Sequence, residues 1–221
     1  MLQLAYMLGL SNLTFDSLLS TFHQLFDLIQ RIALFVQERR LQGIYEVISQ
    51  SRTVTLRDAA GEMATIDTLQ EVRFRQNHVA VLLDYVWGDG DILADYRCAP
   101  GTPVDRYKEG TRHVVVISLR ELKSVGDELT FRTHRKIVGG FTRPAECWET
   151  EVYHRTQRLE THIIFPKERR CQRATVCVQS TGQTVALGAN AFHQLPDGRQ
   201  VLRWACVKPK LNERYLLRWE W

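Results

Sequence analysis

Hydrophobic positions follow two different periods along this chain. Within residues 13–40, Phe15, Phe22, Ile29 and Val36 recur every seven residues, and Leu18, Leu25 and Ile32 follow three positions after the first three. This spacing is typical of one apolar face of an α-helix. From residue 44 onward, apolar and polar positions tend to alternate, which is typical of strands. The pattern therefore predicts an N-terminal amphipathic helical segment followed by a β-rich region.

The final octet shows the alternation most clearly. Tyr215, Leu217, Trp219 and Trp221 fall on one side of an extended strand, and the charged residues of the octet fall on the other. Two large aromatic residues on the apolar side suit a buried face. We therefore expect a terminal strand with one face built into a core.

Turn-forming residues separate the other apolar runs. A hairpin is expected between residues 54–56 and 63–66 around Asp58–Gly61, and a second between residues 79–87 and 92–96 around Gly88–Asp91. Further strands are predicted at 113–119, 129–131, 148–152, 159–165, 174–178, 201–206 and 215–221. About ten short strands without intervening long helices favour antiparallel pairing over βαβ units.

The predicted fold class is therefore α+β: an N-terminal amphipathic helical segment followed by a mainly antiparallel β-sandwich or barrel. The expected division is a helical segment at 1–51 and a β-rich domain at 52–221, with a candidate sub-boundary at 98–110, where charge and pattern both change.

The helical segment suggests an interaction surface. Seven-residue spacing suits a coiled-coil seam, and it also suits a helix docked on its own domain. The additional apolar residues Leu28, Leu34 and Phe35 widen the face and favour docking or a bundle. The residues predicted to contact a protein partner or a second copy are Phe15, Leu18, Phe22, Leu25, Ile29, Ile32 and Val36.

Composition excludes several classes of protein. No run approaches the roughly 18 apolar residues that a transmembrane helix needs, and the first ten residues lack the features of a secretory signal. These absences predict a cytoplasmic protein. The five cysteines are an odd number without C-x-x-C spacing, which argues against a disulfide framework and a zinc ribbon. No cofactor is expected.

The net charge of +4 conceals an uneven distribution. Residues 1–51 carry −1, residues 52–110 carry −3 and residues 111–221 carry +8. Arginine, which pairs bidentately with carboxylates and phosphates, far outnumbers lysine; a GC-rich genome would have the same effect on composition. The predicted anion-binding residues are Arg132, Arg135, Lys136, Lys167, Arg169, Arg170 and Arg173.

Signals for catalysis are weak. The chain has no H-x-x-x-H, no G-x-S-x-G and no phosphate-binding loop. His154 and His162 could meet across a hairpin as an acid/base pair, but a solvated sheet face with cross-strand charge pairs is the favoured explanation of both. The Gly88–Asp91 segment resembles a calcium loop in composition, but Asp-Gly between apolar runs is the stronger signal for a turn.

The sequence thus favours a non-enzymatic intracellular interaction or regulatory module. It would bind a protein partner through the helix and an anionic surface through the arginine-rich β face. One alternative is a nucleic-acid-binding β-barrel. The other is a hydrolase or metal enzyme that uses the region of His154 and His162.

Overall fold

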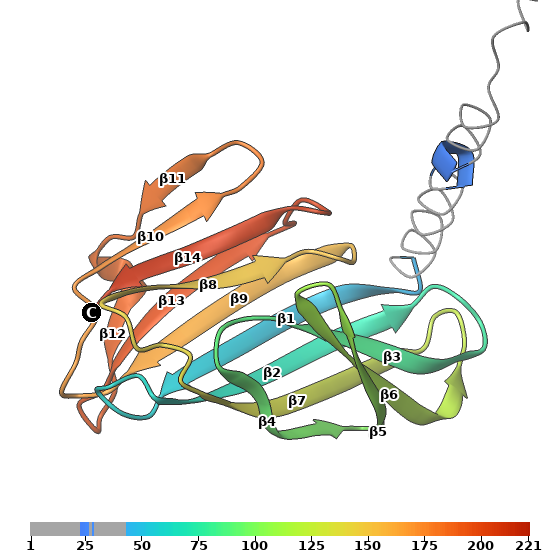
Figure 1. Cartoon of the computed structure of the whole chain (residues 1–221), viewed down its shortest axis with the longest axis horizontal. Coiled ribbons are helices and arrows are strands. Elements are labelled where there is room, and N and C mark those ends of the chain that lie inside the picture. Colours follow the sequence, from blue (N-terminus) through green and yellow to red (C-terminus); the bar gives the residue numbers. More distant parts are fainter. Residues whose placement is uncertain (1–22, 27, 29–42) are drawn as a thin grey trace, which may run out of the picture. The chain divides into compact units, whose positions relative to one another are not determined.

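The structure is a computed structural model that describes residues 23–26, 28 and 43–221. Within these ranges nearly all regular structure is strand (Figure 1). The exceptions are helical residues 23–26 and 28 and the short 3-10 helix η2 (Ala189–Ala191). The predicted α+β class is therefore wrong, and no amphipathic helix is supported. An apolar stripe indicates only which face of a helix would be apolar. The stability of the helix itself depends on a surface against which that face can pack.

Fourteen strands form three sheets in the described part of the chain. The seven-stranded sheet has the order β12 (Phe192–Gln194), β13 (Gln200–Val207), β9 (Thr156–Phe165), β1 (Tyr45–Leu56), β2 (Met63–Phe74), β7 (Glu128–Val138) and β4 (Asp91–Ala99). The four-stranded sheet has the order β11 (Gln183–Ala186), β10 (Arg173–Val178), β14 (Arg214–Glu220) and β8 (Ala145–Glu151). The three-stranded sheet has the order β3 (Val79–Val86), β6 (Arg112–Lys123) and β5 (Thr102–Glu109).

Pairing is antiparallel throughout these sheets except between β1 and β9. The first predicted hairpin is confirmed, because β1 and β2 pair with Val54 opposite Ile66. The second is wrong: β3 pairs with β6, whereas β4 pairs with β7 in another sheet. An Asp-Gly turn can close a hairpin or lead a chain from one sheet to another, and only long-range pairing decides between them.

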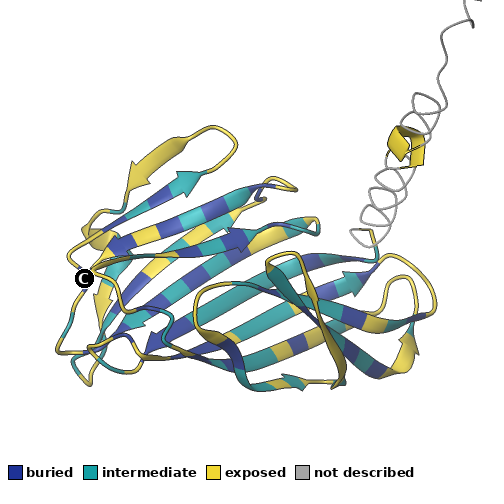
Figure 2. Ribbon diagram, viewed as in Figure 1, coloured by how far each residue is buried: buried dark blue, intermediate teal, exposed yellow. Residues whose placement is uncertain are grey.

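Both smaller sheets cover the same face of the seven-stranded sheet. Trp148 of β8 packs against Arg52 of β1 and Arg135 of β7. Buried residues of all three sheets form one continuous hydrophobic cluster. Figure 2 shows buried positions alternating with more exposed ones along the strands. The β region is therefore a sandwich in which two small sheets share one large one.

The terminal strand confirms the prediction made from the last octet. Tyr215, Leu217, Trp219 and Trp221 are all buried, and the neighbouring Arg218 and Glu220 are exposed. The Trp219 ring lies 5.8 Å from the ring of Phe141 and 6.0 Å from that of Phe165. These contacts join β14 to β9 across the sandwich.

The chain divides into two compact units, residues 1–42 and 43–221, and β1 already begins at Tyr45. No helix in the described ranges is long and apolar enough to cross a membrane.

Phe165→Ala should lower the free energy of unfolding by about 3–5 kcal/mol, because the side chain is fully buried against Trp219 and Trp221. Val207→Ala, at a position 69% exposed, should change it by less than about 0.5 kcal/mol. Urea unfolding of both variants measures the difference. Equal effects would contradict packing between the sheets at Phe165.

Candidate functional site

Polar side chains interrupt the apolar inner face of the seven-stranded sheet. On β1, Gln50 and Arg52 share the inner face with Val54 and Leu56, because alternate residues of a strand point to the same side. Arg52 lies opposite Thr68 of β2, and Thr68 lies opposite Thr133 of β7. A polar band therefore crosses three adjacent strands inside the sandwich.

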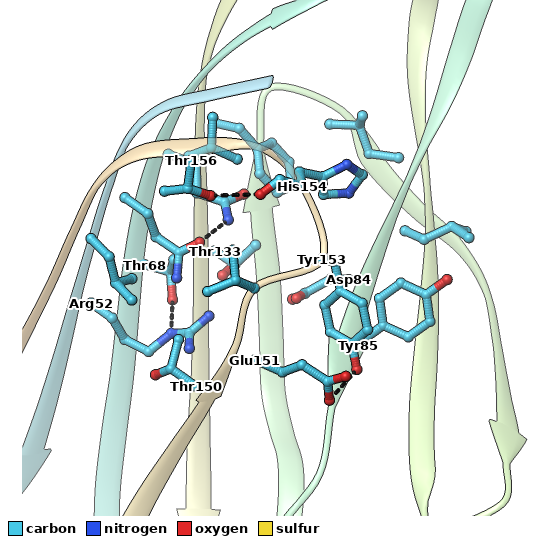
Figure 3. Close-up of a pocket in the computed structure, with 18 of the residues that line it drawn as sticks. Arg52, Thr68, Asp84, Tyr85, Thr133, Thr150, Glu151, Tyr153, His154 and Thr156 are labelled. Atoms are coloured by element: carbon cyan, nitrogen blue, oxygen red, sulfur yellow. Dashed lines mark hydrogen bonds between the residues drawn. The ribbon is translucent and has the colours of Figure 1, made fainter. Parts of the chain in front are cut away.

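Above this band lies a cavity with two lobes, here called the inter-sheet cleft. The small lobe has a volume of about 70 Å³ and reaches Tyr153 and His154. The large lobe has a volume of about 210 Å³ and reaches Arg135, Phe141 and Trp148. Both lobes are lined by Arg52, Thr68, Thr133, Asp84, Tyr85 and Trp87. Figure 3 shows the small lobe, with Arg52 and Asp84 pointing into it from different strands.

Two edge strands of the smaller sheets form the roof of the cleft. β3 ends the three-stranded sheet and supplies Asp84 and Tyr85, whereas β8 ends the four-stranded sheet and supplies Trp148 and Thr150. The two strands belong to separate sheets. The cleft therefore lies between the edges of the two covering sheets.

Two arginines meet at the floor. Arg52 donates a hydrogen bond from Nε to the Thr68 hydroxyl at 3.2 Å, and Arg135, which is 7% exposed, donates to the carbonyl oxygen of Ile92 at 2.8 Å. Their Cζ atoms lie 5.4 Å and 5.9 Å from the centre of the Trp148 ring. A guanidinium carries five N–H donors, so these hydrogen bonds engage a minority of the available donors.

Burial and mutual repulsion both act on these guanidinium groups. Burial lowers the pKa of Arg52 below its ordinary value. The pKa of Arg135 falls to about 10, mainly because of burial, and the charge of Arg52 contributes to the fall. Asp84 opposes the shift at both arginines. Because arginine side chains stay protonated in proteins, the floor carries two positive charges.

Asp84 is the carboxylate that faces both arginines. It accepts a hydrogen bond from the Tyr96 hydroxyl at 2.8 Å, and burial together with the Asp84 charge raises the pKa of Tyr96. Among these three groups one positive charge is in excess, and the other carboxylates that line the large lobe are Asp89, Glu146 and Glu149. A ligand with one negative charge would balance the excess at the floor.

Two lining residues also have unused polar groups. In the part of the chain that the structure describes, the indole N–H of Trp148 and the hydroxyl of Thr150 are buried without a hydrogen-bond partner. A buried polar group without a partner is unfavourable by about 1–3 kcal/mol. The cleft wall therefore retains hydrogen-bonding capacity beside its cationic floor.

The two ends of the cleft carry their own ion pairs. Glu151 contacts Arg112 at 2.6 Å and Arg214 at 3.1 Å, and it accepts a hydrogen bond from the Tyr153 hydroxyl at 2.9 Å. At the large lobe, Arg143 pairs with Asp89 at 3.3 Å on the exposed rim. Glu146 lines the same lobe, and burial raises its pKa.

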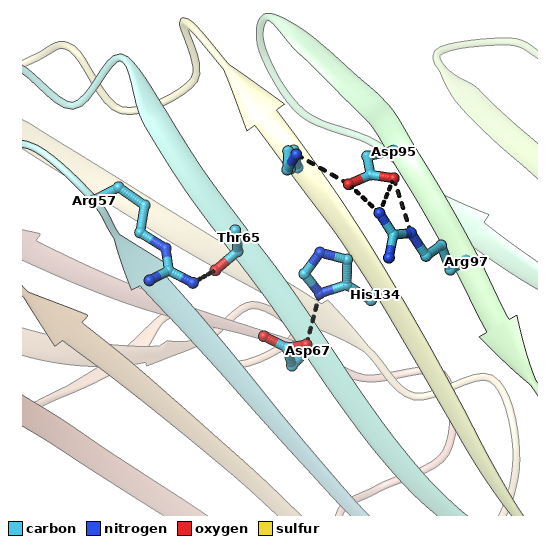
Figure 4. Close-up of polar contacts among 7 residues, drawn as sticks. Arg57, Thr65, Asp67, Asp95, Arg97 and His134 are labelled. Carbon is cyan, nitrogen blue, oxygen red and sulfur yellow. Dashed lines mark hydrogen bonds and ion pairs between the residues drawn. The ribbon is translucent and has the colours of Figure 1, made fainter.

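The opposite face of the seven-stranded sheet carries a different set of charges. His134 Nδ1 lies 2.7 Å from Asp67, and Asp95 contacts both Arg97 and Lys136 (Figure 4). The hydrogen bonds from Arg97 and Lys136 lower the pKa of Asp95. These are exposed or half-exposed pairs, two of them between neighbouring strands and the Asp95–Arg97 pair within β4, and such pairs contribute little stability individually.

The basic residues predicted to bind anions occupy several different surroundings. Arg135 points into the sandwich, whereas Arg132 and Lys136 lie on the outer face of the same strand. Arg169 stacks over Trp221 at 3.9 Å and donates hydrogen bonds to the carbonyls of Ala59 and Arg143. The remaining members lie after β9: Lys167 and Arg170 in the β9–β10 loop, and Arg173, which pairs with Glu220 at 2.6 Å, at the start of β10.

The two histidines of the enzyme hypothesis also lie apart. His154 stacks on the buried Tyr45 with 3.9 Å between ring centres and lines the small lobe. His162 lies on β9 beside Glu160 at 3.9 Å, and burial lowers its pKa. Among the described residues, no cluster of three or more His, Cys, Asp or Glu side chains could hold a metal ion.

Most of the predicted helical contact residues lie outside the described residues: Phe15, Leu18, Phe22, Ile29, Ile32 and Val36. Leu25 is described as helical, and it is 52% exposed.

Sequence reasoning did not single out Arg52 or Asp84, and it placed Arg135 on the surface. The two arginines could have been found from the alternation of side chains between the two faces of a strand. Arg52 lies two residues before Val54, and Arg135 lies two residues before Ile137, so both occupy positions in an inward apolar series. A charged residue in such a series is a candidate for a functional interior site.

No family model matches this chain, and no curated protein matches it. Its fold resembles part of an M1 zinc metallopeptidase from Deinococcus radiodurans, with 8% identity and a TM-score of 0.47. A mutant of that enzyme bound to a Tyr-Ser-Ala substrate gives 9% identity and a TM-score of 0.49. The match covers 78% of this chain and 42% of each of those chains. Similarity at this level identifies no function for this protein.

Asp84→Asn should lower the free energy of unfolding by about 2–4 kcal/mol, because it leaves two neighbouring guanidinium groups without a counter-charge. Arg135→Met should change it by less than about 1 kcal/mol, since the charge of Asp84 still acts on Arg52 and one buried charge disappears. Chemical denaturation at neutral pH compares the two variants. A larger loss for Arg135→Met would mean that the two arginines do not compete for Asp84.

Proposed function

We propose that this protein is a non-enzymatic interaction module that holds an acidic group of its ligand in the inter-sheet cleft. The observation that carries the proposal is the placement of two inward guanidinium groups, Arg52 and Arg135, at the floor of the cleft, where the charge of Asp84 acts on both. An unbalanced cation in a low-dielectric interior attracts an anion more strongly than a surface cation does.

The contacts within the cleft support binding rather than proton transfer. Arginine stays protonated throughout the physiological range, so the floor can orient and neutralise an anion but is poorly suited to act as a general base. Guanidinium groups also donate two parallel hydrogen bonds to a carboxylate, which fixes its orientation as well as its charge. The aromatic contacts of Trp148 hold both arginines in place before a ligand arrives.

This proposal keeps the anionic partner expected from the sequence and changes its site. The basic residues after β9 include Arg169, which contacts two carbonyl oxygens, and Arg173, which pairs with Glu220. The terminal N–H groups at the floor of the cleft are more available to a ligand, because few of them have a partner within the described ranges.

Binding of small anions provides the test. Acetate, sulfate and phosphate at millimolar concentration should raise the melting temperature in a saturable way, compared with sodium chloride at equal ionic strength. A ligand present at 100 times its dissociation constant stabilises the folded state by about 2.7 kcal/mol. Arg52→Met and Arg135→Met should each abolish the response of every anion that binds.

Arg132→Met is the matched control, because it removes the same charge from the same strand on the outer face. It should leave the response unchanged. A response that survives in both cleft variants, or that never saturates, would refute binding in the cleft.

A further inference from the structure

The size of the large lobe sets a limit on the ligand. Its volume is about 210 Å³. An apolar cavity of about 150 Å³ in another protein accommodates benzene, so this lobe can accept a substituted six-membered ring and little more. A nucleotide or a folded peptide segment exceeds that volume.

The walls of the large lobe divide into two chemical regions. Arg52, Arg135 and Thr133 provide hydrogen-bond donors at the floor. Trp87, Ile137 and Phe141 line the lobe elsewhere, and the ring of Trp87 also contacts Arg112 and Tyr153. A ligand that fits both regions has a charged end and a flat apolar body.

The charges around the lobe favour a single negative charge. At the floor, Arg52 and Arg135 exceed Asp84 by one positive charge, whereas Glu146, Glu149 and Asp89 also line the lobe and repel additional negative charge. Glu149 is partly balanced by Arg214 at 3.7 Å. Asp89 is partly balanced by Arg143, but Glu146 makes no ion pair in the described ranges; it accepts a hydrogen bond from the backbone N–H of Arg143. A carboxylate fits this balance better than a phosphate, which carries up to two charges at neutral pH.

We propose that the ligand of the inter-sheet cleft is a small aromatic monocarboxylic acid, with its carboxylate between Arg52 and Arg135 and its ring against Trp87 and Phe141. This inference rests on the proposed function and specifies the chemistry of its ligand. The carboxylate supplies acceptors to unused guanidinium N–H groups and reduces their mutual repulsion.

The same chemistry has two sources: a free aromatic acid, and a peptide that ends in an aromatic residue. Phenylacetate represents the first and N-acetyl-Gly-Gly-Phe the second, with phenylacetamide and the C-terminal peptide amide as neutral controls. Binding of either acid in preference to its amide supports the proposal, and the acid that binds more tightly identifies the source.

Isothermal titration calorimetry with the full chain provides the main measurement. Phenylacetate should bind at least about tenfold more tightly than acetate, because burial of a phenyl ring adds to the shared carboxylate contact. Trp87→Ala should weaken phenylacetate binding about tenfold and leave acetate binding unchanged. Glu146→Gln should tighten binding of phenylacetate, because it removes a like charge from the rim of the lobe.

The outcomes separate this inference from the proposed function. If acetate or phosphate binds through Arg52 and Arg135 while phenylacetate and the peptide bind no more tightly, the aromatic inference is overturned and the proposed function stands. If no anion binds in a way that depends on these arginines, both are overturned. Equal binding of phenylacetate and phenylacetamide would overturn the aromatic inference alone, because the carboxylate would then contribute nothing to phenylacetate binding.

Discussion

The inner face of the seven-stranded sheet must accommodate two guanidinium groups without water as their main solvent. Transferring a charge into a protein interior is strongly unfavourable unless other groups replace the lost hydration. Here Asp84 supplies an opposite charge, Thr68 and the Ile92 carbonyl accept hydrogen bonds, and the Trp148 ring supplies its electron-rich surface. The position of every one of these groups is set by strand pairing, so the site is as rigid as the sandwich that contains it.

The architecture explains why this interior is open. A single sheet over the whole inner face would have packed against it at close-packed density. Instead, two smaller sheets share the task, and the edge strands β3 and β8 border the cleft between them. Apolar contacts such as those of Phe165 with Trp219 hold the four-stranded sheet in place beyond the cleft. The large sheet therefore serves as a core surface at one end and as the floor of a polar cavity in its middle.

The alternation of apolar residues was sufficient to predict most of the strands, because side-chain direction in a strand is a local property. It was insufficient to predict their partners: the segment after β3 has the residues of a hairpin turn, but β4 pairs with β7. Gly90 reflects that pairing, since a Cβ atom there would lie 2.1 Å from the carbonyl oxygen of Val138. Nothing in the local sequence distinguishes this close approach from an ordinary turn.

For the candidate site, too, the sequence predicts the direction of a side chain but not its neighbours. Arg132, Arg135 and Lys136 are neighbours in sequence and suggest one basic patch, yet alternation alone places Arg135 on the other face. Its inward position was therefore predictable. Its proximity to Asp84 and Trp148 was not, because those residues belong to strands of two other sheets. The predicted helix shows a further limit, since periodicity cannot establish a surface for the apolar stripe to contact.

The parallel pairing of β1 with β9 affects the order in which the large sheet can form during synthesis of the chain. Val47 lies beside Thr156, and β2 occupies the other edge of β1. During translation β1 and β2 are synthesised well before β9. The edge of β1 that later pairs with β9 therefore has unpaired N–H and carbonyl groups while more than half of the β region is translated. During that interval other polypeptides can add a strand to this exposed edge. The yield of folded protein therefore depends on protection of the edge until β9 pairs with it.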